Sequence, residues 1–355
     1  MAEQHHPAVS WRVNEMKPSG RSAIALSIVV VLFAASVLFL VLRQPELENT
    51  LIVYGPRGIS GMATALLQEF QKRYNVNATF IHYDMGSIDI ANKLISEKGD
   101  PIADVIIGVP EFYAKQVIDA DVLDIYTPPE IGVIPASEVW DNTGHILPMD
   151  KGYILITYNQ TILSQRGLPA PRTLDDLTNE QYRGLVFYQD PSTSGTGLSF
   201  LLWVLSTKGT ESGFTFLKQL EPNVKLHPSG WTSSIVALQR GEVAIGSMFN
   251  TDVEYVEVPK LESTASEGFV YREGIALVKG AKHREIAKKF IEFALGVEGQ
   301  DIVAPAGYMY PVNPDASFSA LAQAPIPQVQ VTFNSSIAGN VVEWLDRWRR
   351  EVKGA

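Results

Sequence analysis

A turn of small polar residues offers the clearest chemistry in the sequence. Its candidate ligand-binding residues are Ser192, Thr193, Ser194, Gly195 and Thr196. An apolar stretch with helical character, residues 198–208, follows the turn. A helix that begins here would direct backbone N–H groups and its positive dipole end towards an anion such as phosphate. The same residue types also form ordinary helix caps, so the turn alone leaves both interpretations open.

Aromatic side chains form a second candidate group. Tyr54, Trp231, Tyr255 and Tyr308 lie on loops or at the ends of segments, where no periodicity requires burial. An aromatic wall would stack a flat heteroaromatic ring and favour a cationic one, by about 0.5–2 kcal/mol per cation–π contact. The alternative is that these rings pack between structural units.

Acidic residues on predicted loops could bind an amine. Asp84, Glu111 and Asp252 are the candidates, although acidic loop residues are usually solvated.

The sequence lacks the usual signatures of catalysis. It has no nucleophile elbow, zinc-binding H-E-x-x-H helix, phosphate loop or dinucleotide-binding turn. The six histidines are scattered apart from the pair His5–His6, so their spacing indicates neither a metal cage nor a catalytic triad. We therefore expect no enzyme activity, no cofactor and no metal, with an enzyme or a sensor that uses a cleft as the alternative class.

Composition narrows the class of partner. The 355 residues are 46% hydrophobic and 19% charged, enough for two domains with separate cores. A net charge of -10 and the absence of a long basic run argue against a nucleic-acid partner and favour a small ligand. The chain has no cysteine, which excludes disulfides, thiolate ligands and a lipidated cysteine anchor.

Residues 22–42 have the properties of a membrane span. The run contains no charged residue and would extend about 30 Å as a helix, the thickness of a bilayer core. It continues through bulky residues to Arg43, unlike a cleavable signal sequence. Arg12, Lys17 and Arg21 precede it, so the positive-inside rule places the N-terminus in the cytoplasm. We expect a retained single-pass anchor with the globular body on the periplasmic or extracellular side.

The body shows alternating strand and helix patterns. Apolar strands at 51–54, 77–83 and 103–109 are each followed by helical periodicity, as in a parallel sheet covered on both faces. The patterns resume with strands at 152–158, 184–188, 243–248 and 274–279, with helices at 198–208, 233–240 and 283–295 between or after them. This predicts an α/β fold with two lobes. Ligands collect beyond the carboxyl ends of strands in such sheets, which favours the turns already described.

Five local motifs carry a resemblance to a known family. They are Ala103-Asp104-Val105, Asp150-Lys151-Gly152-Tyr153, the run from Tyr188-Gln189-Asp190-Pro191 to Gly197, Gly230-Trp231, and Met309-Tyr310-Pro311-Val312. In this order the chain resembles the type II periplasmic binding proteins of ABC importers, and among them the thiamine-binding subfamily. The resemblance implies two α/β lobes joined by crossing strands, a ligand cleft between them, an ABC transporter permease as partner and a monomeric state.

These observations together predict limits for each part of the chain. They are a cytoplasmic tail 1–21, the transmembrane anchor 22–42, a linker 43–50, lobe 1 from 51–148 and 256–312, lobe 2 from 149–255, and a C-terminal helical segment 313–355.

Two departures from the thiamine-binding pattern keep the ligand open. Tyr308 stands where that subfamily usually has tryptophan, and Phe249 and Asn250 follow Ser247 where it tends to have a tyrosine. Thiamine or a thiamine phosphate is the expected ligand, with Trp231 and Tyr308 against its rings. An organophosphonate or a ferric ion is the alternative, although the adjacent tyrosines typical of ferric-ion binders are absent.

Overall fold

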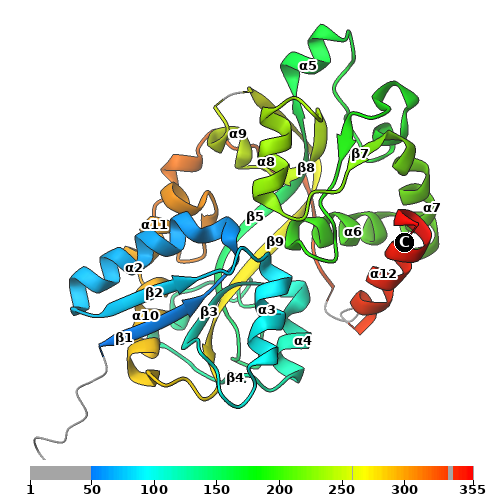
Figure 1. The fold of residues 1–355 in the computed structure, drawn as a ribbon. Helices are drawn as coiled ribbons and strands as arrows, with labels where there is room; N and C mark the ends of the chain where they lie inside the picture. Colours follow the sequence, from blue (N-terminus) through cyan, green and yellow to red (C-terminus); the bar gives the residue numbers. More distant parts are fainter. Residues whose placement is uncertain (1–48, 258, 335–338, 355) are drawn as a thin grey trace, which may run out of the picture. The chain divides into compact units, whose positions relative to one another are not determined.

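The computed structural model describes residues 49–257, 259–334 and 339–354. Within this range the chain forms two α/β lobes that are joined by long strands (Figure 1). None of the described helices is both long enough and apolar enough to cross a bilayer. The expected membrane span, residues 22–42, lies outside the described residues.

The first lobe is built on three parallel strands with helices on both faces. The strands are β1 (Thr50–Tyr54), β2 (Asn77–Ile81) and β3 (Val105–Pro110), and the helices are α2 (Ser60–Tyr74), α3 (Ser87–Ser96) and α4 (Ala114–Asp119). Strand β1 lies in the centre and pairs in parallel with β2 and β3. Every residue of β3 is buried, as the continuous apolar run predicts for a strand covered on both faces.

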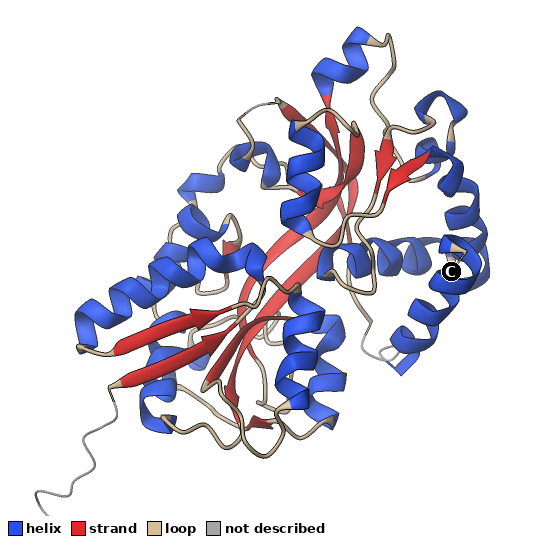
Figure 2. Cartoon of the chain, in the orientation of Figure 1, coloured by secondary structure: helices blue, strands red, loops and turns tan. Residues whose placement is uncertain are grey.

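Two long antiparallel strands cross from one lobe to the other. They are β5 (Leu147–Asn159) and β9 (Leu261–Val278), and Figure 2 shows them as the two longest strands of the sheet. β9 pairs with β3 in the first lobe, and β5 pairs with β8 (Ile245–Phe249) in the second. The hydrogen-bonded strand order therefore continues from β2 to β7 through the crossing.

The second lobe continues the sheet from β8. Its further strands are β6 (Val186–Phe187) and β7 (Val224–Leu226), and its helices are α5 (Gln160–Gln165), α6 (Gly195–Lys208), α7 (Thr210–Leu220), α8 (Trp231–Gln239) and α9 (Asp252–Tyr255). Helix α6 is buried from its first residue through Leu205, which explains why its sequence is apolar on every side.

The chain then returns to the first lobe and finally crosses back. The elements are α10 (Arg284–Leu295), α11 (Val297–Ile302), β10 (Tyr310–Pro311), β11 (Val329–Val331) and α12 (Val341–Trp348), with the short β4 (Leu123–Asp124) at the edge of β9. Strand β11 pairs with β9, and α12 packs on the second lobe, where Trp348 Nε1 donates to Tyr188 Oη at 2.9 Å. The C-terminal segment is therefore a further connection between the lobes.

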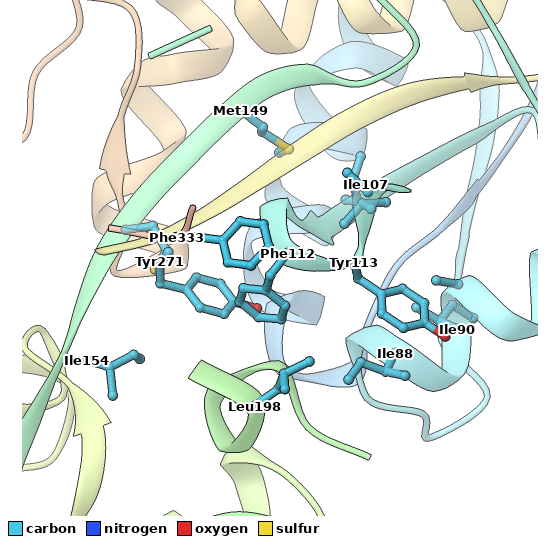
Figure 3. Close-up of a cluster of buried hydrophobic side chains, with 14 of the residues drawn as sticks. Ile88, Ile90, Ile107, Phe112, Tyr113, Met149, Ile154, Leu198, Tyr271 and Phe333 are labelled. Carbon is cyan, nitrogen blue, oxygen red and sulfur yellow. The ribbon is translucent and has the colours of Figure 1, made fainter. Parts of the chain in front are cut away.

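Buried aromatic rings pack beside the crossing strands. The ring centroids of Phe112 and Tyr271 are 5.8 Å apart, and those of Phe112 and Phe333 are 6.1 Å apart. Figure 3 shows these three rings near Leu198 of α6 and Ile154 of β5. The core thus joins residues from both lobes and from the C-terminal segment at the crossing.

Three features of the fold differ from the sequence-based expectation. The strand expected at 274–279 begins at Leu261. The sequence did not predict its first half, because that half is polar and partly exposed and lacks an apolar run. The strand expected at 152–158 spans Leu147–Asn159. Helix α7 was not expected. The lobe limits expected from the sequence stay a prediction, since β5 and β9 run through both lobes.

Candidate functional site

A cavity of about 520 Å³ lies where the two lobes meet. Its walls come from the segments after β1 and β2, the start of α6, helix α8, the β8–α9 turn and the middle of β9. The lining residues used below are Arg57, Asp84, Ser87, Ser194, Gly195, Thr196, Trp231, Arg240, Glu242, Phe249, Asp252, Tyr271, Glu273 and Tyr308. This size is in the range typical of sites for small ligands.

The start of helix α6 brings the polar turn to the cavity. Ser194 caps the helix, because its Oγ accepts from Gly197 N at 3.4 Å and donates to Gln189 Oε1 at 2.5 Å. Gly195 N donates across the cleft to Ser87 Oγ at 3.2 Å. A Cβ at Gly195 would lie 2.5 Å from Tyr271 Oη, so only glycine allows this approach.

The remaining turn residues lie behind this wall. Ser192 donates to Asp190 Oδ1, and Thr193 Oγ1 donates to Ser229 O at 2.9 Å. Neither residue lines the cavity, whereas Ser194, Gly195 and Thr196 do. The structure thus brings the second half of the predicted turn to the cavity.

Three aromatic residues form a ladder at one side of the cavity. The ring centroids of Trp231 and Tyr255 are 4.8 Å apart, and those of Tyr255 and Tyr308 are 5.0 Å apart. Trp231 and Tyr308 line the cavity, and Tyr255 packs between them with much of its surface exposed. Tyr308 has a φ of 54°, an uncommon conformation for a bulky residue, and surrounding structure must hold it there.

Asp252 connects this ladder to the β8–α9 turn. Its Oδ1 accepts from Trp231 Nε1 at 2.9 Å, and its Oδ2 accepts from the backbone N–H of Phe249 at 2.9 Å. Burial raises the pKa of Asp252 to about 7, although both hydrogen bonds oppose this change. Asp252 and Phe249 both line the cavity, as the sequence led us to expect of ligand-binding residues.

A buried acidic pair at the crossing strands was missed by the sequence analysis. Asp150 of β5 and Glu273 of β9 are direct partners in the antiparallel register. Tyr271 Oη donates to Glu273 Oε1 at 2.8 Å, whereas neither carboxylate oxygen of Asp150 has a hydrogen-bond partner in the described structure. Glu273 and Tyr271 line the cavity, whereas Asp150 does not. The sequence analysis gave Asp150 only as part of the motif Asp150-Lys151-Gly152-Tyr153, and the polar Glu273 within a buried strand was the available signal.

Burial and mutual repulsion shift the titration of this pair. Burial raises the pKa of Glu273 to about 7, although the hydrogen bond from Tyr271 opposes the change. Burial, and then the negative charge of Glu273, raise the pKa of Asp150 well above its ordinary value. Burial also raises the pKa of Tyr271, so its hydroxyl remains a donor.

The other charged groups of the lining are already paired. Arg57 lies 3.4 Å from Asp84, and Arg240 lies 3.8 Å from Glu242, in both cases between nitrogen and carboxylate oxygen. Asp252 and Glu273 are therefore the acidic lining groups without a cationic partner within the described structure. This arrangement favours a ligand with a positive charge.

Two further predicted site residues, besides Ser192, Thr193 and Tyr255, lie outside the lining. Tyr54 is fully buried, and its hydroxyl bonds to Tyr83 Oη at 3.1 Å and Glu97 Oε1 at 3.0 Å. Asn250 is also fully buried, where its amide accepts from Tyr153 N and donates to Tyr310 Oη. Both residues belong to the packing around the site. Within residues 49–354 as described, no three His, Cys, Asp or Glu side chains are placed to hold a metal ion.

Comparison with known proteins identifies relatives along most of the chain. Residues 100–333 match the family described as bacterial extracellular solute-binding proteins. The thiamine-binding periplasmic protein of Escherichia coli is 25% identical, over 82% of this chain and 89% of its own length. A Salmonella typhimurium relative, provisionally named a 2-aminoethylphosphonate-binding periplasmic protein, is 23% identical over 76% of this chain and 81% of its length.

The fold also matches a solved structure. A periplasmic thiamin-binding protein superposes with a TM-score of 0.78 and 21% identity, covering 85% of this chain and 96% of that protein. This likeness shows the two-lobed periplasmic-binding-protein fold that the sequence predicted.

Proposed function

We propose that this chain, which belongs to the family of bacterial extracellular solute-binding proteins, binds thiamine or a thiamine phosphate for an ABC importer. The receptor would hold the solute in the cavity between its lobes and deliver it to a permease. Its relatives are named as solute-binding proteins, and we infer that this chain likewise binds a solute and is not an enzyme.

One observation carries the proposal. Trp231 and Tyr308 present rings to a cavity in which Asp252 and Glu273 have no cationic partner within the described structure. Thiamine is flat and cationic, so ring stacking and charge attraction would act on the same molecule. The start of α6, with Ser194 and Thr196, would receive a phosphate group if one is present.

Calorimetry on the full chain, purified in detergent micelles, tests this assignment. Trp231→Ala should weaken thiamine and thiamine monophosphate about equally, by at least about tenfold in Kd, which equals about 1.4 kcal/mol. Trp231→Phe, which keeps an aromatic surface, should weaken them less. Phe318→Ala serves as the control, because Phe318 is exposed and does not line the cavity.

Thr196 provides the second arm of this experiment. Thr196→Val should weaken thiamine monophosphate by several-fold more than thiamine, because it removes a hydroxyl at the helix start. Absence of binding by both compounds would exclude the thiamine assignment.

A small zwitterion is the second candidate ligand. Tyr271 Oη lies close to Gly195 and donates to Glu273, so the start of α6 and the acidic pair border the same part of the cavity. An aminoalkylphosphonate could place its phosphonate at α6 and its ammonium group at Glu273. Binding of 2-aminoethylphosphonate without binding of thiamine would favour this ligand.

We further propose that residues 22–42 tether the body to the membrane on the extracytoplasmic side. The uncharged, span-length sequence of this run supports the proposal. Protease added to intact cells should then digest the body and leave a membrane-bound fragment that contains the N-terminus.

A further inference from the structure

The Asp150–Glu273 pair has no counter-charge among the residues that the structure describes. The two residues face each other across β5 and β9, where like charges destabilise a sheet. Their exposed fractions are 1% and 4%, so water does not solvate either carboxylate well. Glu273 accepts one hydrogen bond, from Tyr271, and Asp150 accepts none in the described structure.

The nearest cationic side chains on these strands lie on the opposite face of the sheet. Lys151 directly follows Asp150, and Arg272 directly precedes Glu273. Lys151 and Arg272 are also register partners of each other. Because side chains alternate along a strand, both point away from the pair. Each has its own carboxylate, with Lys151 Nζ at 2.5 Å from Glu138 and Arg272 Nη1 at 3.1 Å from Glu111.

Within the described residues, the groups packed around the pair from other elements supply no unpaired positive charge either. Strands β3 and β10 place Pro110 and Pro311 beside it in the register. Helix α3 contributes the Ser87 hydroxyl, and the start of α6 contributes Gly195. The remaining ionisable groups are Tyr271, on the same strand, and Asp252, in the cavity lining. The lining also holds Arg57 and Arg240, each of which is paired with its own carboxylate.

We propose that the Asp150–Glu273 pair is the binding site for a cationic group of the solute, an organic ammonium or a charged heterocycle, which replaces a proton held by the pair. Glu273 contacts the cation from the cavity lining, and Asp150 is a positioning residue that adds charge from behind. This inference rests on the proposed receptor function and defines the charge of its ligand.

The ring geometry at this place suits a cation. Phe249 and Tyr271 both line the cavity, with centroids 5.1 Å apart and planes at 90°. A cation beside Glu273 would therefore also meet an aromatic surface, which attracts positive charge.

The exchange balances in charge. In the ligand-free protein the pair holds one proton and carries a net charge of about −1, because two close buried carboxylates cannot both ionise readily. The entering cation supplies one positive charge, and the proton leaves to solvent. Protons and cations thus compete, so the affinity for the cation should fall with decreasing pH.

The first experiment needs no ligand. Infrared difference spectra of the full chain at pH 7 should show the C=O band of a buried protonated carboxylic acid. This band should weaken in Asp150→Asn/Glu273→Gln, in which Asp252 remains as a buried acid, and should be unchanged in Glu138→Gln, whose carboxylate belongs to the paired face. Absence of the band from the unchanged protein overturns the proposal, since no proton would be available for exchange.

The second experiment measures proton release on binding. Calorimetry at pH 7 in PIPES and in imidazole, whose ionisation enthalpies differ, gives the number of protons exchanged with thiamine, choline or 2-aminoethylphosphonate as probe. At least one of these cations should release a substantial fraction of a proton. Asp150→Asn and Glu273→Gln should each abolish most of the release, and Glu138→Gln should not.

The pH profile adds a quantitative arm. With choline or thiamine, Kd should rise by up to about tenfold for each pH unit below 7 in the unchanged protein. In Glu273→Gln the profile should be flat, with binding at pH 8 weaker by at least about tenfold.

The outcomes separate this inference from the thiamine assignment. If thiamine does not bind but another cation releases protons through the pair, the inference stands and the thiamine assignment fails. If thiamine binds without proton release and equally well to Glu273→Gln, the inference fails and the thiamine assignment stands. Preferential binding of fructose 6-phosphate, unaffected by Glu273→Gln, would overturn the inference as well.

Discussion

The two faces of the β5–β9 crossing differ in how their charged side chains are paired. On one face, Lys151 and Arg272 are each held by a carboxylate, at 2.5 Å and 3.1 Å. On the other face, Asp150 and Glu273 oppose each other, and no cationic side chain in the described part of the chain pairs with either of them. Both arrangements lie at the same level of the same two strands, but the side chains of the paired face are 11–26% exposed, whereas Asp150 and Glu273 are 1% and 4% exposed. The face without a cation is therefore also the more buried one.

In our proposal, the comparison distinguishes ion pairs that stabilise the crossing, those of Lys151 and Arg272, from the carboxylates of Asp150 and Glu273, which bind a ligand. Pairing does not remove the cost of burial, because burial still raises the pKa of Glu111 although Arg272 opposes this change. On the unpaired face, Asp150 and Glu273 carry the same cost of burial, and no described cationic side chain offsets it. We propose that a cationic group of the solute completes this site.

Removal of Arg272 should have the largest effect on stability. Arg272→Met leaves Glu111 without its partner in a poorly solvated place, and we expect a loss of about 2–3 kcal/mol in the free energy of unfolding at pH 7. Uptake of a proton by Glu111 limits the loss. Urea unfolding of the full chain measures it, and an unchanged midpoint would mean that the paired face does not stabilise the crossing.

Removal of one acid from the unpaired face should increase the free energy of unfolding, whereas removal of Arg272 lowers it. The pKa of Glu273 is raised from 4.5 to about 7, so the folded state holds this proton more tightly than the unfolded chain. The unchanged protein therefore loses stability as the pH rises from about 4.5 through 7. Glu273→Gln should be more stable by about 2 kcal/mol at pH 8 and nearly equal at pH 4.5. Unfolding curves at the two pH values test this, and a destabilised variant at pH 8 would contradict it.

Removal of Glu138 should have the smallest effect. Its partner Lys151 is partly exposed and can extend its ammonium group into water, so Glu138→Gln should cost about 1 kcal/mol or less. Urea unfolding at pH 7 checks this value. A loss as large as that of Arg272→Met would show that the two pairs act as one network.

The sequence predicted the parts of the fold that have simple periodicity. The apolar run of β3 and the helix behind the polar turn were confirmed, because buried strands and buried helices read as continuous apolar segments. Strand β9 was predicted only in part, since residues such as Glu262 and Ser266 interrupt the apolar pattern where the strand is half-exposed. Its extent depends on pairing with β5, which is a tertiary effect.

The candidate site was predictable where local residue type restricts position. Ser194, Trp231 and Asp252 lie at element starts, and the structure brings all three to one cavity. Tyr54 shows the limit of this reasoning, because nothing in its neighbourhood distinguishes a buried ring from a cavity wall. The Asp150–Glu273 pair was hidden for another reason: only the register of two strands far apart in the sequence brings the carboxylates together.

Because the C-terminal segment crosses back, the two ends of the described chain lie on different lobes. The described chain starts at β1 in one lobe and ends on the other lobe, where Lys353 Nζ lies 2.7 Å from Asp190. Because the sequence has no cysteine, thiols introduced by Asn49→Cys and Gly354→Cys would be the only sites for maleimide dyes. Energy transfer between dyes at these two exposed positions would report any change in lobe separation, so the receptor could serve as an optical sensor for its own solute.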